Sequence, residues 1–306
     1  MAKRIDLNFF PGFKRKAISF TIDDGNLKLD EKFISYVKPA GIVGTFNLVS
    51  SYITPSKREA YQNLYRDYEI ANHQKYHPMW MRDSSLPVAE EEFNPDTADK
   101  NKIYKTGVEG LYYYCMKNLD RWFKACDEEN YLRFVEDGKR ELEEIFGVEI
   151  KDFVWPYGRQ PSPALAEGLK NMGYRSVRGV VYDGFDLPED RMNWGFYATY
   201  KNMLERAEEF ERLSDDGKLK AFIFGVHAHD FENAGRWDVL EDFCKLYGNR
   251  ENDFYYARVG EIFDCEDAIK AATVSETEIK NNSSIPLYAE IDGERVIIAP
   301  LSSVNV

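Results

Sequence analysis

Apolar and polar residues follow two different rhythms along this chain. Short apolar or alternating runs predict strands, and they lie at residues 5–9, 17–22, 43–48, 69–72, 153–155, 174–181, 221–227 and 255–259. Apolar residues three or four positions apart predict helices, and these lie at residues 30–37, 56–68, 131–146, 162–173, 203–213, 237–247 and 261–272. Strands that alternate with helices are typical of βα units around a parallel sheet or barrel.

Two segments break this alternation. Residues from about 79 to 119 carry prolines, an acidic run and a tyrosine run, and we interpret them as an irregular insertion. Beyond residue 272, two apolar runs flank Asp292-Gly293, which is a good β-hairpin turn signal. The sequence therefore predicts a barrel at 1–272, interrupted at about 79–119, and a β-rich appendage at 273–306.

Composition narrows the class of protein. The 306 residues include 40 basic and 53 acidic side chains, which gives a net charge of −13. Such a field repels nucleic acids and anionic membranes, although a local basic groove is compatible with it. No apolar run approaches the length of a bilayer span, and no signal peptide is evident at the N-terminus, so we expect a cytoplasmic protein. The four cysteines form no CxxC pair and fit buried apolar positions.

The four histidines form two close pairs at the ends of expected strands: His73 with His77, and His227 with His229. The chemistry of barrel enzymes lies at such strand ends. Pro78 disfavours a helix at His77, and Gln74 stands where a zincin would need glutamate, so a metalloprotease is disfavoured. Taken alone, the first pair fits a metal site or two structural histidines equally well.

Asp23 and Asp24 end the expected strand at 17–22, and Gly25 follows them. Adjacent carboxylates in a strand point to opposite sides of the chain, so one could bind a metal while the other faces substrate. A plain Asp-Gly turn is the alternative. If the strand at 221–227 continues, His227 and His229 share one face, and we expect one of them to be functional.

Four segments, in their order along the chain, resemble the motifs of the NodB-type polysaccharide deacetylases, which form carbohydrate esterase family 4. They are Thr21-Ile22-Asp23-Asp24-Gly25, His73-Gln74-Lys75-Tyr76-His77-Pro78, Trp155-Pro156-Tyr157-Gly158 and the late strand that ends at His227. Residues 190–194 look like a weakened form of a further motif, DxxDW. The resemblance covers roughly residues 14–265 and implies a distorted (β/α) barrel of the NodB-homology type with a C-terminal β-hairpin extension.

The chain departs from the family pattern at two positions. The arginine of the third motif, which orients the catalytic base in the family, would fall at Phe153. Arg159, Arg175 or Arg178 could supply that charge from elsewhere. Asn193 stands where the DxxDW motif has its second aspartate.

The resemblance also implies a division of roles. Asp24, His73 and His77 would bind one divalent metal; zinc is the first expectation, and cobalt, nickel and ferrous iron stay open. Asp23 would be the general base, and His227 the general acid, oriented by Asp190. The Tyr157 N–H would stabilise the oxyanion. Trp155, Tyr157 and Trp194 would offer faces to a sugar ring, and we hypothesise that His229 lines the substrate groove.

The expected activity is removal of N- or O-linked acetyl groups from a poly- or oligosaccharide. One alternative is a hydrolase of the same fold that acts on a non-glycan amide or formamide; another is a non-catalytic carbohydrate-binding protein. We expect an acetylated oligosaccharide as partner and neither nucleic acid nor membrane. The insertion follows His77 directly, so we expect it to shape the cleft or to form a contact in a homo-oligomer.

Overall fold

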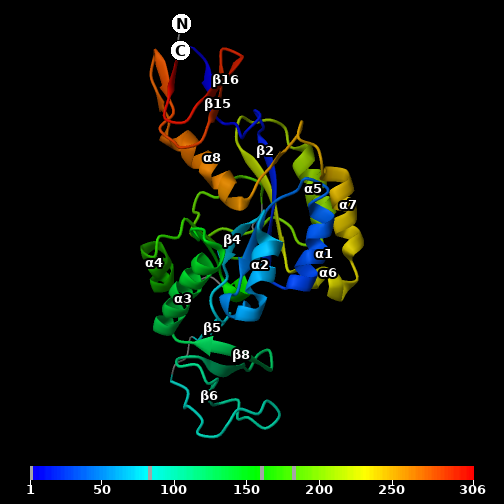
Figure 1. Ribbon diagram of the computed structural model, residues 1–306, viewed down its shortest axis with the longest axis vertical. Coiled ribbons are helices and arrows are strands. Elements are labelled where there is room, and N and C mark those ends of the chain that lie inside the picture. The colour runs from blue at the N-terminus through cyan, green and yellow to red at the C-terminus, as the bar shows by residue number, and fades with distance from the viewer. Residues whose placement is uncertain (1–2, 82–84, 159–161, 181–183) are drawn as a thin grey trace.

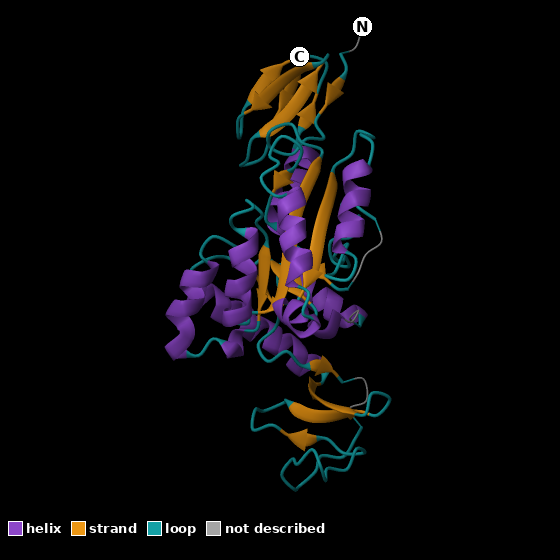
Figure 2. Cartoon of the chain, turned by 90° about the vertical axis from the view of Figure 1, so that its right-hand side faces the viewer, coloured by secondary structure: helices purple, strands orange, loops and turns teal. Residues whose placement is uncertain are grey.

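The computed structural model describes residues 3–81, 85–158, 162–180 and 184–306. The described chain is elongated and has three parts (Figure 1). A layered α/β body lies in the middle, a small β-structure that holds both termini lies at one end, and a second small sheet lies at the other. Figure 2 shows the two small β-structures at opposite ends of the body.

A parallel sheet forms the centre of the body. Its strand order is β10-β9-β4-β3-β2-β11, and β12 also pairs with the first half of β2. The strands are β2 (Lys16–Asp24), β3 (Thr45–Leu48), β4 (Glu69–Asn72), β9 (Asp152–Val154), β10 (Ser176–Arg178), β11 (Lys220–Val226) and β12 (Tyr255–Tyr256). Residues 17–22 of β2 are all buried, as expected for a parallel strand that is covered on both faces.

An irregular segment closes the gap between the two outer strands. Trp194 bridges to Arg178 of β10, and Ala198 bridges to Phe224 of β11, both in parallel orientation. Backbone hydrogen bonds from Gly179 to Trp194 and from Gly225 to Ala198 complete the closure. The expected distorted (β/α) barrel is therefore confirmed, and its last wall is a bridge of single residues rather than a regular strand.

Helices pack around this sheet with their apolar faces inward. They are α1 (Leu27–Val37), α2 (Arg58–Tyr65), α3 (Glu128–Phe146), α4 (Pro163–Asn171), α5 (Met203–Arg212), α6 (Ala228–Ala234), α7 (Trp237–Tyr247) and α8 (Val259–Ala271), with single turns η1 (Ser50–Tyr52), η2 (Pro55–Lys57) and η3 (Pro156–Gly158). Local signals set several ends. Asp127 accepts from the Asn130 N–H at the start of α3, and Gly147 ends that helix with a φ of 68°.

The insertion differs from the expectation of an irregular loop. It forms a four-stranded sheet in the order β5-β8-β7-β6. The strands are β5 (Met79–Trp80), β6 (Tyr104–Lys105), β7 (Tyr112–Met116) and β8 (Arg121–Cys126). One face buries its own cluster, which includes Met79, Met116 and Phe123. The sheet therefore extends to Cys126, beyond the expected end near residue 119.

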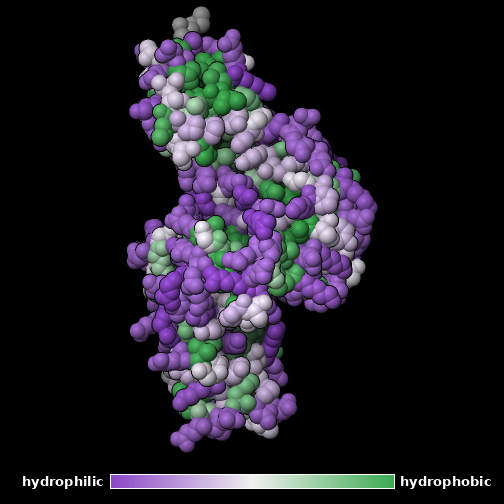
Figure 3. Space-filling view, viewed as in Figure 1, coloured by the Kyte–Doolittle hydropathy of each residue, from purple (hydrophilic) through white to green (hydrophobic). Residues whose placement is uncertain are grey.

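Both ends of the chain build the appendage. The expected hairpin is present as β15 (Leu287–Ile291) and β16 (Glu294–Ile298), with positive φ at both turn residues, Asp292 and Gly293. β1 (Ile5–Asp6) pairs with β15, so the N-terminal strand belongs to this sheet rather than to the barrel. β13 (Thr273–Val274), β14 (Glu278–Lys280) and β17 (Ser303–Asn305) form a second small sheet. Figure 3 shows apolar side chains gathered on the visible face of this end.

None of the helices in the described part of the chain combines the length and the apolar composition that crossing a bilayer requires.

Candidate active site

The histidines and the paired aspartates meet at one end of the barrel. Because the strands are parallel, their carboxyl ends point the same way, and β2, β4, β9, β10 and β11 all end beside one cavity. This cavity has a volume of about 480 Å³. We call it the central cavity. Its lining includes Asp23, Asp24, His73, His77, Arg121, Trp155, Tyr157, Arg178, Phe196, His227 and His229.

Asp24, His73 and His77 turn one ligand atom each toward a common point. His73 Nε2 lies 3.1 Å from His77 Nε2, and Asp24 Oδ1 lies 3.6 Å and 3.7 Å from these two nitrogens. Metal–ligand bonds of about 2.1 Å at tetrahedral angles separate ligand atoms by about 3.4 Å. The three atoms therefore fit the spacing of ligands around one small divalent ion.

The contacts of His73 favour a metal-ligating state of its ring. Its Nδ1 lies 2.9 Å from the Val154 carbonyl oxygen, so the proton sits on Nδ1 and the Nε2 lone pair faces Asp24 and His77. Burial lowers the pKa of His73 to about 4. Burial, together with the nearby His73, lowers the pKa of His77 to about 3. Both rings are thus neutral near pH 7, as metal ligation requires.

Asp23 faces away from this triad, toward a buried cation. Arg178, the last residue of β10, ion-pairs with Asp23 Oδ1, and its side chain is only 3% exposed. Asn47 on β3 donates to the same oxygen at 2.7 Å. Burial is the largest single effect and would raise the pKa of Asp23, but the charge and hydrogen bond of Arg178, together with His73 and His227, hold the pKa well below 3.8. Asp23 is therefore an oriented, ionised carboxylate.

Arg178 makes the contact with Asp23 that the family resemblance would assign to an arginine at the position of Phe153. Phe153 is fully buried and packs against Trp155 and Tyr174. Arg175, the second candidate, instead pairs with Asp152, Glu69 and Asp264. Arg159, the third, lies outside the described residues. The guanidinium thus reaches Asp23 from β10, the strand next to the one that carries the third motif.

The strand ends at Val226, one residue before the expected end, and does not continue through His227 to His229. His227 is the N-cap of α6, a short helix that the sequence pattern did not reveal. Asp230 accepts from the His227 backbone N–H and contacts His227 Nδ1 at 3.0 Å. Burial lowers the pKa of His227, but Asp230, Asp23 and Asp24 outweigh this and raise it to about 9. His227 is therefore a cation at neutral pH in the metal-free protein.

The expected partner of His227, Asp190, lies elsewhere. Asp190 is exposed, and its Oδ1 accepts from the Met192 N–H in a local turn. Its neighbour Arg191 is held by Glu266 and Asp267 of α8. The assignment of Asp190 is corrected to Asp230, whose position three residues after His227 is a capping-box spacing that was visible in the sequence.

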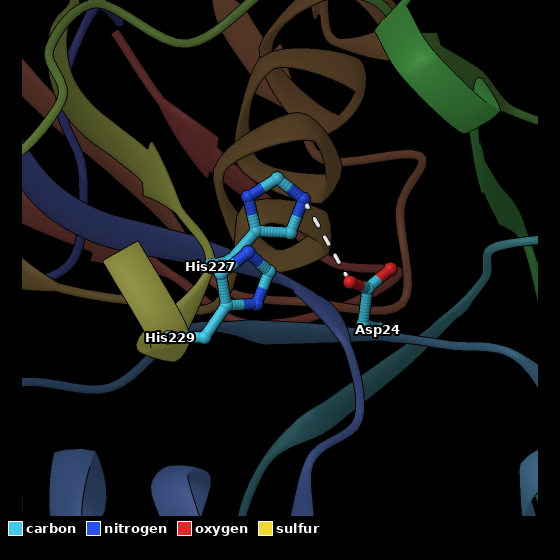
Figure 4. A group of neighbouring side chains, drawn as sticks. All are labelled: Asp24, His227 and His229. Carbon is cyan, nitrogen blue, oxygen red and sulfur yellow. Dashed lines mark ion pairs between the residues drawn. The ribbon is translucent and has the colours of Figure 1, made fainter. Parts of the chain in front are cut away.

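His229 stacks on His227 with ring centroids 4.5 Å apart. Figure 4 shows both imidazoles beside Asp24, with the ion pair that joins His227 to Asp24 at 3.9 Å. Asp24, His227 and His229 also lie close enough to share an ion. However, the His227 and His229 side chains are 36% and 39% exposed, against 2% and 15% for His73 and His77. The buried triad is therefore the better formed candidate for a metal site.

The three aromatic residues expected to contact a sugar ring lie in two different environments. Tyr157 is 40% exposed, lines the central cavity and contacts His77 edge-on at 4.6 Å. Trp155 also lines the cavity, although it is only 5% exposed. Trp194 is equally buried but packs against Phe263 in the core, outside the residues that line the cavity. The structure thus keeps Trp155 and Tyr157 at the cavity and assigns Trp194 to packing.

Sequence reasoning missed Asn47, Asp230 and the insertion residue Arg121. Asn47 carried a usable signal, because it lies on the strand next to Asp23 and pairs with it in register. Arg121 carried none, because its approach to the cavity depends on how the insertion folds back.

Comparison with known proteins identifies the family to which this chain is similar. A family model described as polysaccharide deacetylase matches residues 11–177, more than half of the chain. None of the curated proteins matches the sequence. Among solved structures, a protein from Mycobacterium smegmatis that is provisionally assigned as a polysaccharide deacetylase superposes with a TM-score of 0.53 at 14% identity, over 89% of this chain and 96% of that one.

Two further structures are similar at lower scores. A family 4 acetyl xylan esterase from Clostridium thermocellum, in complex with a cobalt ion, has a TM-score of 0.46 at 14% identity, over 82% of this chain and 92% of that one. A peptidoglycan deacetylase from Bacillus subtilis has a TM-score of 0.44 at 14% identity, over 84% and 94%. The family match contains the motifs of Asp23, His73 and Tyr157, and the described strands form the barrel that those motifs imply. The chain belongs to the polysaccharide deacetylase family.

Proposed function

We propose that this protein is a metal-dependent hydrolase that removes N- or O-linked acetyl groups from a poly- or oligosaccharide. The observation that carries the proposal is the spacing of Asp24, His73 and His77 around one point, with an ionised Asp23 and a cationic His227 beside it. A divalent metal on this triad would polarise the acetyl carbonyl and lower the pKa of a water molecule.

Asp23 is the proposed general base. Ionised and held by Arg178 and Asn47, it accepts a proton from the attacking water while the new C–O bond forms at the acetyl carbon. Its Oδ2 lies 4.0 Å from His227 Nε2, so the proposed base and the proposed acid are close enough to act on one acetyl group. By analogy with the family, the backbone N–H of Tyr157 would donate a hydrogen bond to the oxyanion that develops on the acetyl carbonyl.

His227 is the proposed general acid. As the C–N or C–O bond breaks, its imidazolium gives a proton to the leaving amine or alcohol, and acetate is released. Asp230 contacts Nδ1 and keeps the ring charged and oriented, so Nε2 points to the cavity. The alternative of a non-catalytic carbohydrate-binding protein rests on the absence of an arginine at Phe153. The ion pair of Arg178 with Asp23 weakens that argument.

The first test is acetate release by metal-loaded protein, with a chelated control. Suitable substrates are chitooligosaccharides, acetylated xylooligosaccharides and acetylated monosaccharides, together with small formamides and amides. We expect chelator-sensitive release from the glycans. Release from the small amides alone would instead support the non-glycan hydrolase.

Asp23→Asn is the decisive variant. It keeps the size of the side chain and removes the base, so we expect turnover to fall at least about 10²-fold. Metal content, measured by elemental analysis, should stay near one ion per chain because Asp23 is not in the triad. A variant that keeps full activity would remove Asp23 from the mechanism.

A further inference from the structure

Two further cavities join the central cavity and extend it to both sides. One, of about 700 Å³, shares Asp24 and His229 with it; the other, of about 360 Å³, shares His77, Arg121 and Tyr157. Tyr52 lines both outer cavities. We call the three together the groove. Its extent is much greater than a single acetyl group needs, and it passes directly over the candidate metal ligands.

The charge of the groove is opposite to that of the molecule. Among its described lining residues, the only carboxylates are Asp23 and Asp24, and both belong to the candidate active site. Four cations line its outer parts: Lys28 and Lys57 on one side, Arg121 and Lys124 on the other. Apart from these two, none of the acidic side chains in the described chain lines the groove.

These four cations lack carboxylate partners within the described chain. Several other lysines of the protein do form such pairs: Lys32 with Glu232, Lys38 with Asp67, and Lys75 with Glu141. Unpaired cations beside a catalytic site strengthen the local positive potential and attract anions.

Arg121 has a defined place in this arrangement. Its guanidinium lies 5.0 Å over the ring of Phe123, which meets Tyr157 edge-on at 5.4 Å, and Tyr157 in turn meets His77 at 4.6 Å. A short chain of rings therefore connects this cation to a candidate metal ligand. Beyond it, Phe93, Tyr113 and Trp122 line the same side of the groove and suit the apolar faces of sugar rings.

We propose that the groove binds an anionic glycan, an acetylated oligosaccharide whose sugars carry carboxylate or other acidic groups. This inference rests on the proposed function and names its substrate class. Sugar rings pack on the aromatic residues, while acidic groups on units to either side of the reacting acetyl group pair with Arg121 and Lys124 or with Lys28 and Lys57.

The test compares acidic and neutral substrates of equal length. For N-acetyl groups, oligosaccharides of alternating N-acetylhexosamine and uronic acid are compared with chitooligosaccharides. For O-acetyl groups, acetylated oligogalacturonides are compared with acetylated xylooligosaccharides. We expect kcat/KM to be about tenfold higher for the acidic member of the preferred pair. The preference should shrink as salt screens the charges. Equal values at low salt for both pairs would overturn the inference.

Charge-removing variants locate the effect. Arg121→Gln with Lys124→Gln, and Lys28→Gln with Lys57→Gln, should each lower the acidic-to-neutral ratio of kcat/KM several-fold. Lys105→Gln is the matched control, because Lys105 is exposed on β6 of the same insertion but lies outside the groove lining. The proposal would be contradicted if Lys105→Gln lowers the acidic-to-neutral ratio as much as the double variants do, or if neither double variant changes the ratio.

Binding separates this inference from the proposed function. Deacetylated oligogalacturonide, a sulfated oligosaccharide of the same length and a neutral xylooligosaccharide are titrated calorimetrically into the metal-loaded wild-type protein. Tighter binding of either anion without turnover of any acetylated substrate would support the anionic groove and reject the proposed enzymatic activity. Turnover with no preference for anions in binding or kinetics would do the reverse. The carboxylate and sulfate arms show which anion the groove prefers.

Discussion

Asp23 and Asp24 are neighbours in the chain, yet the backbone gives them separate surroundings. Asp24 has a φ of 78°, a left-handed value that is uncommon for any residue except glycine. Gln74, His77 and Tyr157 share this property, so four of the nine described non-glycine residues with positive φ lie in the motifs of the site. Such conformations persist where the surrounding structure holds them, and they cluster at functional sites.

Arg178 is the residue whose role is most open to test. In Arg178→Gln the buried Asp23 loses its cation, so the pKa of Asp23 should rise toward and beyond 3.8. The base works only when ionised, so the acidic limb of the pH profile of kcat/KM should move to higher pH. We also expect kcat to fall about 10- to 100-fold.

Two controls separate positioning from structural damage. Arg178→Lys keeps the charge, so it should restore the acidic limb while recovering only part of kcat, because an ammonium lacks the planar guanidinium fork. Arg175→Gln removes a half-buried arginine, whose ion pairs involve Asp152 and Asp264 rather than Asp23. An acidic limb that does not move in Arg178→Gln would show that the arginine is merely structural.

At the scale of elements, α3 holds the loop that carries the two candidate histidine ligands. Asn72 donates to the Val135 carbonyl of α3 and accepts from the Gln74 N–H, which ties the start of the loop to the helix. Gly138 makes the close approach feasible. A Cβ at this position would lie 2.9 Å from both Asn72 Oδ1 and the Lys75 nitrogen.

Gly138→Ala tests this contact. In a free helix the change would stabilise by about 1 kcal/mol, because alanine has the higher helix propensity. Here the added methyl group meets loop backbone, so we expect lower thermal stability and weaker metal binding. Gly168→Ala in α4 is the control, since its Cβ would meet only the flexible end of Leu132. Unchanged metal affinity in Gly138→Ala would separate α3 from the site.

The elements also show how far sequence reasoning reaches. The barrel strands and most helices follow from periodicity, because buried parallel strands are continuously apolar and surface helices are amphipathic. The insertion could not be derived in this way, since strands such as β5 and β6 have only two residues each. The sequence did not predict helix α6 for a related reason. Its seven residues are too few to show a helical periodicity, and the capping-box spacing of His227 and Asp230 is the only sequence signal of its start.

At the scale of the molecule, the appendage and the insertion stand at opposite ends of the barrel with apolar clusters of their own. The insertion contributes Phe93 and Arg121 to the groove, so its role near the substrate stays a prediction with structural support. The appendage lies far from the groove and shows exposed apolar residues at Val274, Ile297 and Leu301.

The pH dependence of stability is a property of the whole chain, and Asp30 contributes to it with a sign opposite to that of most carboxylates. Asp30 on α1 is fully buried, and Tyr65 donates to its Oδ2 at 2.6 Å. Burial raises the pKa of Asp30 to about 7. Between about pH 4 and pH 7 the native state therefore keeps a proton that the unfolded chain has lost, so the free energy of unfolding falls as pH rises.

Asp30→Asn cannot ionise and keeps the shape of the side chain and an acceptor for Tyr65. Its stability relative to wild type should therefore increase from pH 5 to pH 8 by about 3 kcal/mol, because about two pH units of this range lie below the native pKa and each is worth about 1.4 kcal/mol. Urea unfolding of the metal-free proteins at both pH values measures this difference, and contributions from the site histidines cancel in the comparison. Glu31→Gln, on the exposed face of the same helix, should show no such trend. If the difference between Asp30→Asn and wild type is the same at both pH values, Asp30 is already ionised in the native protein, and its buried charge is stabilised by a contact other than Tyr65.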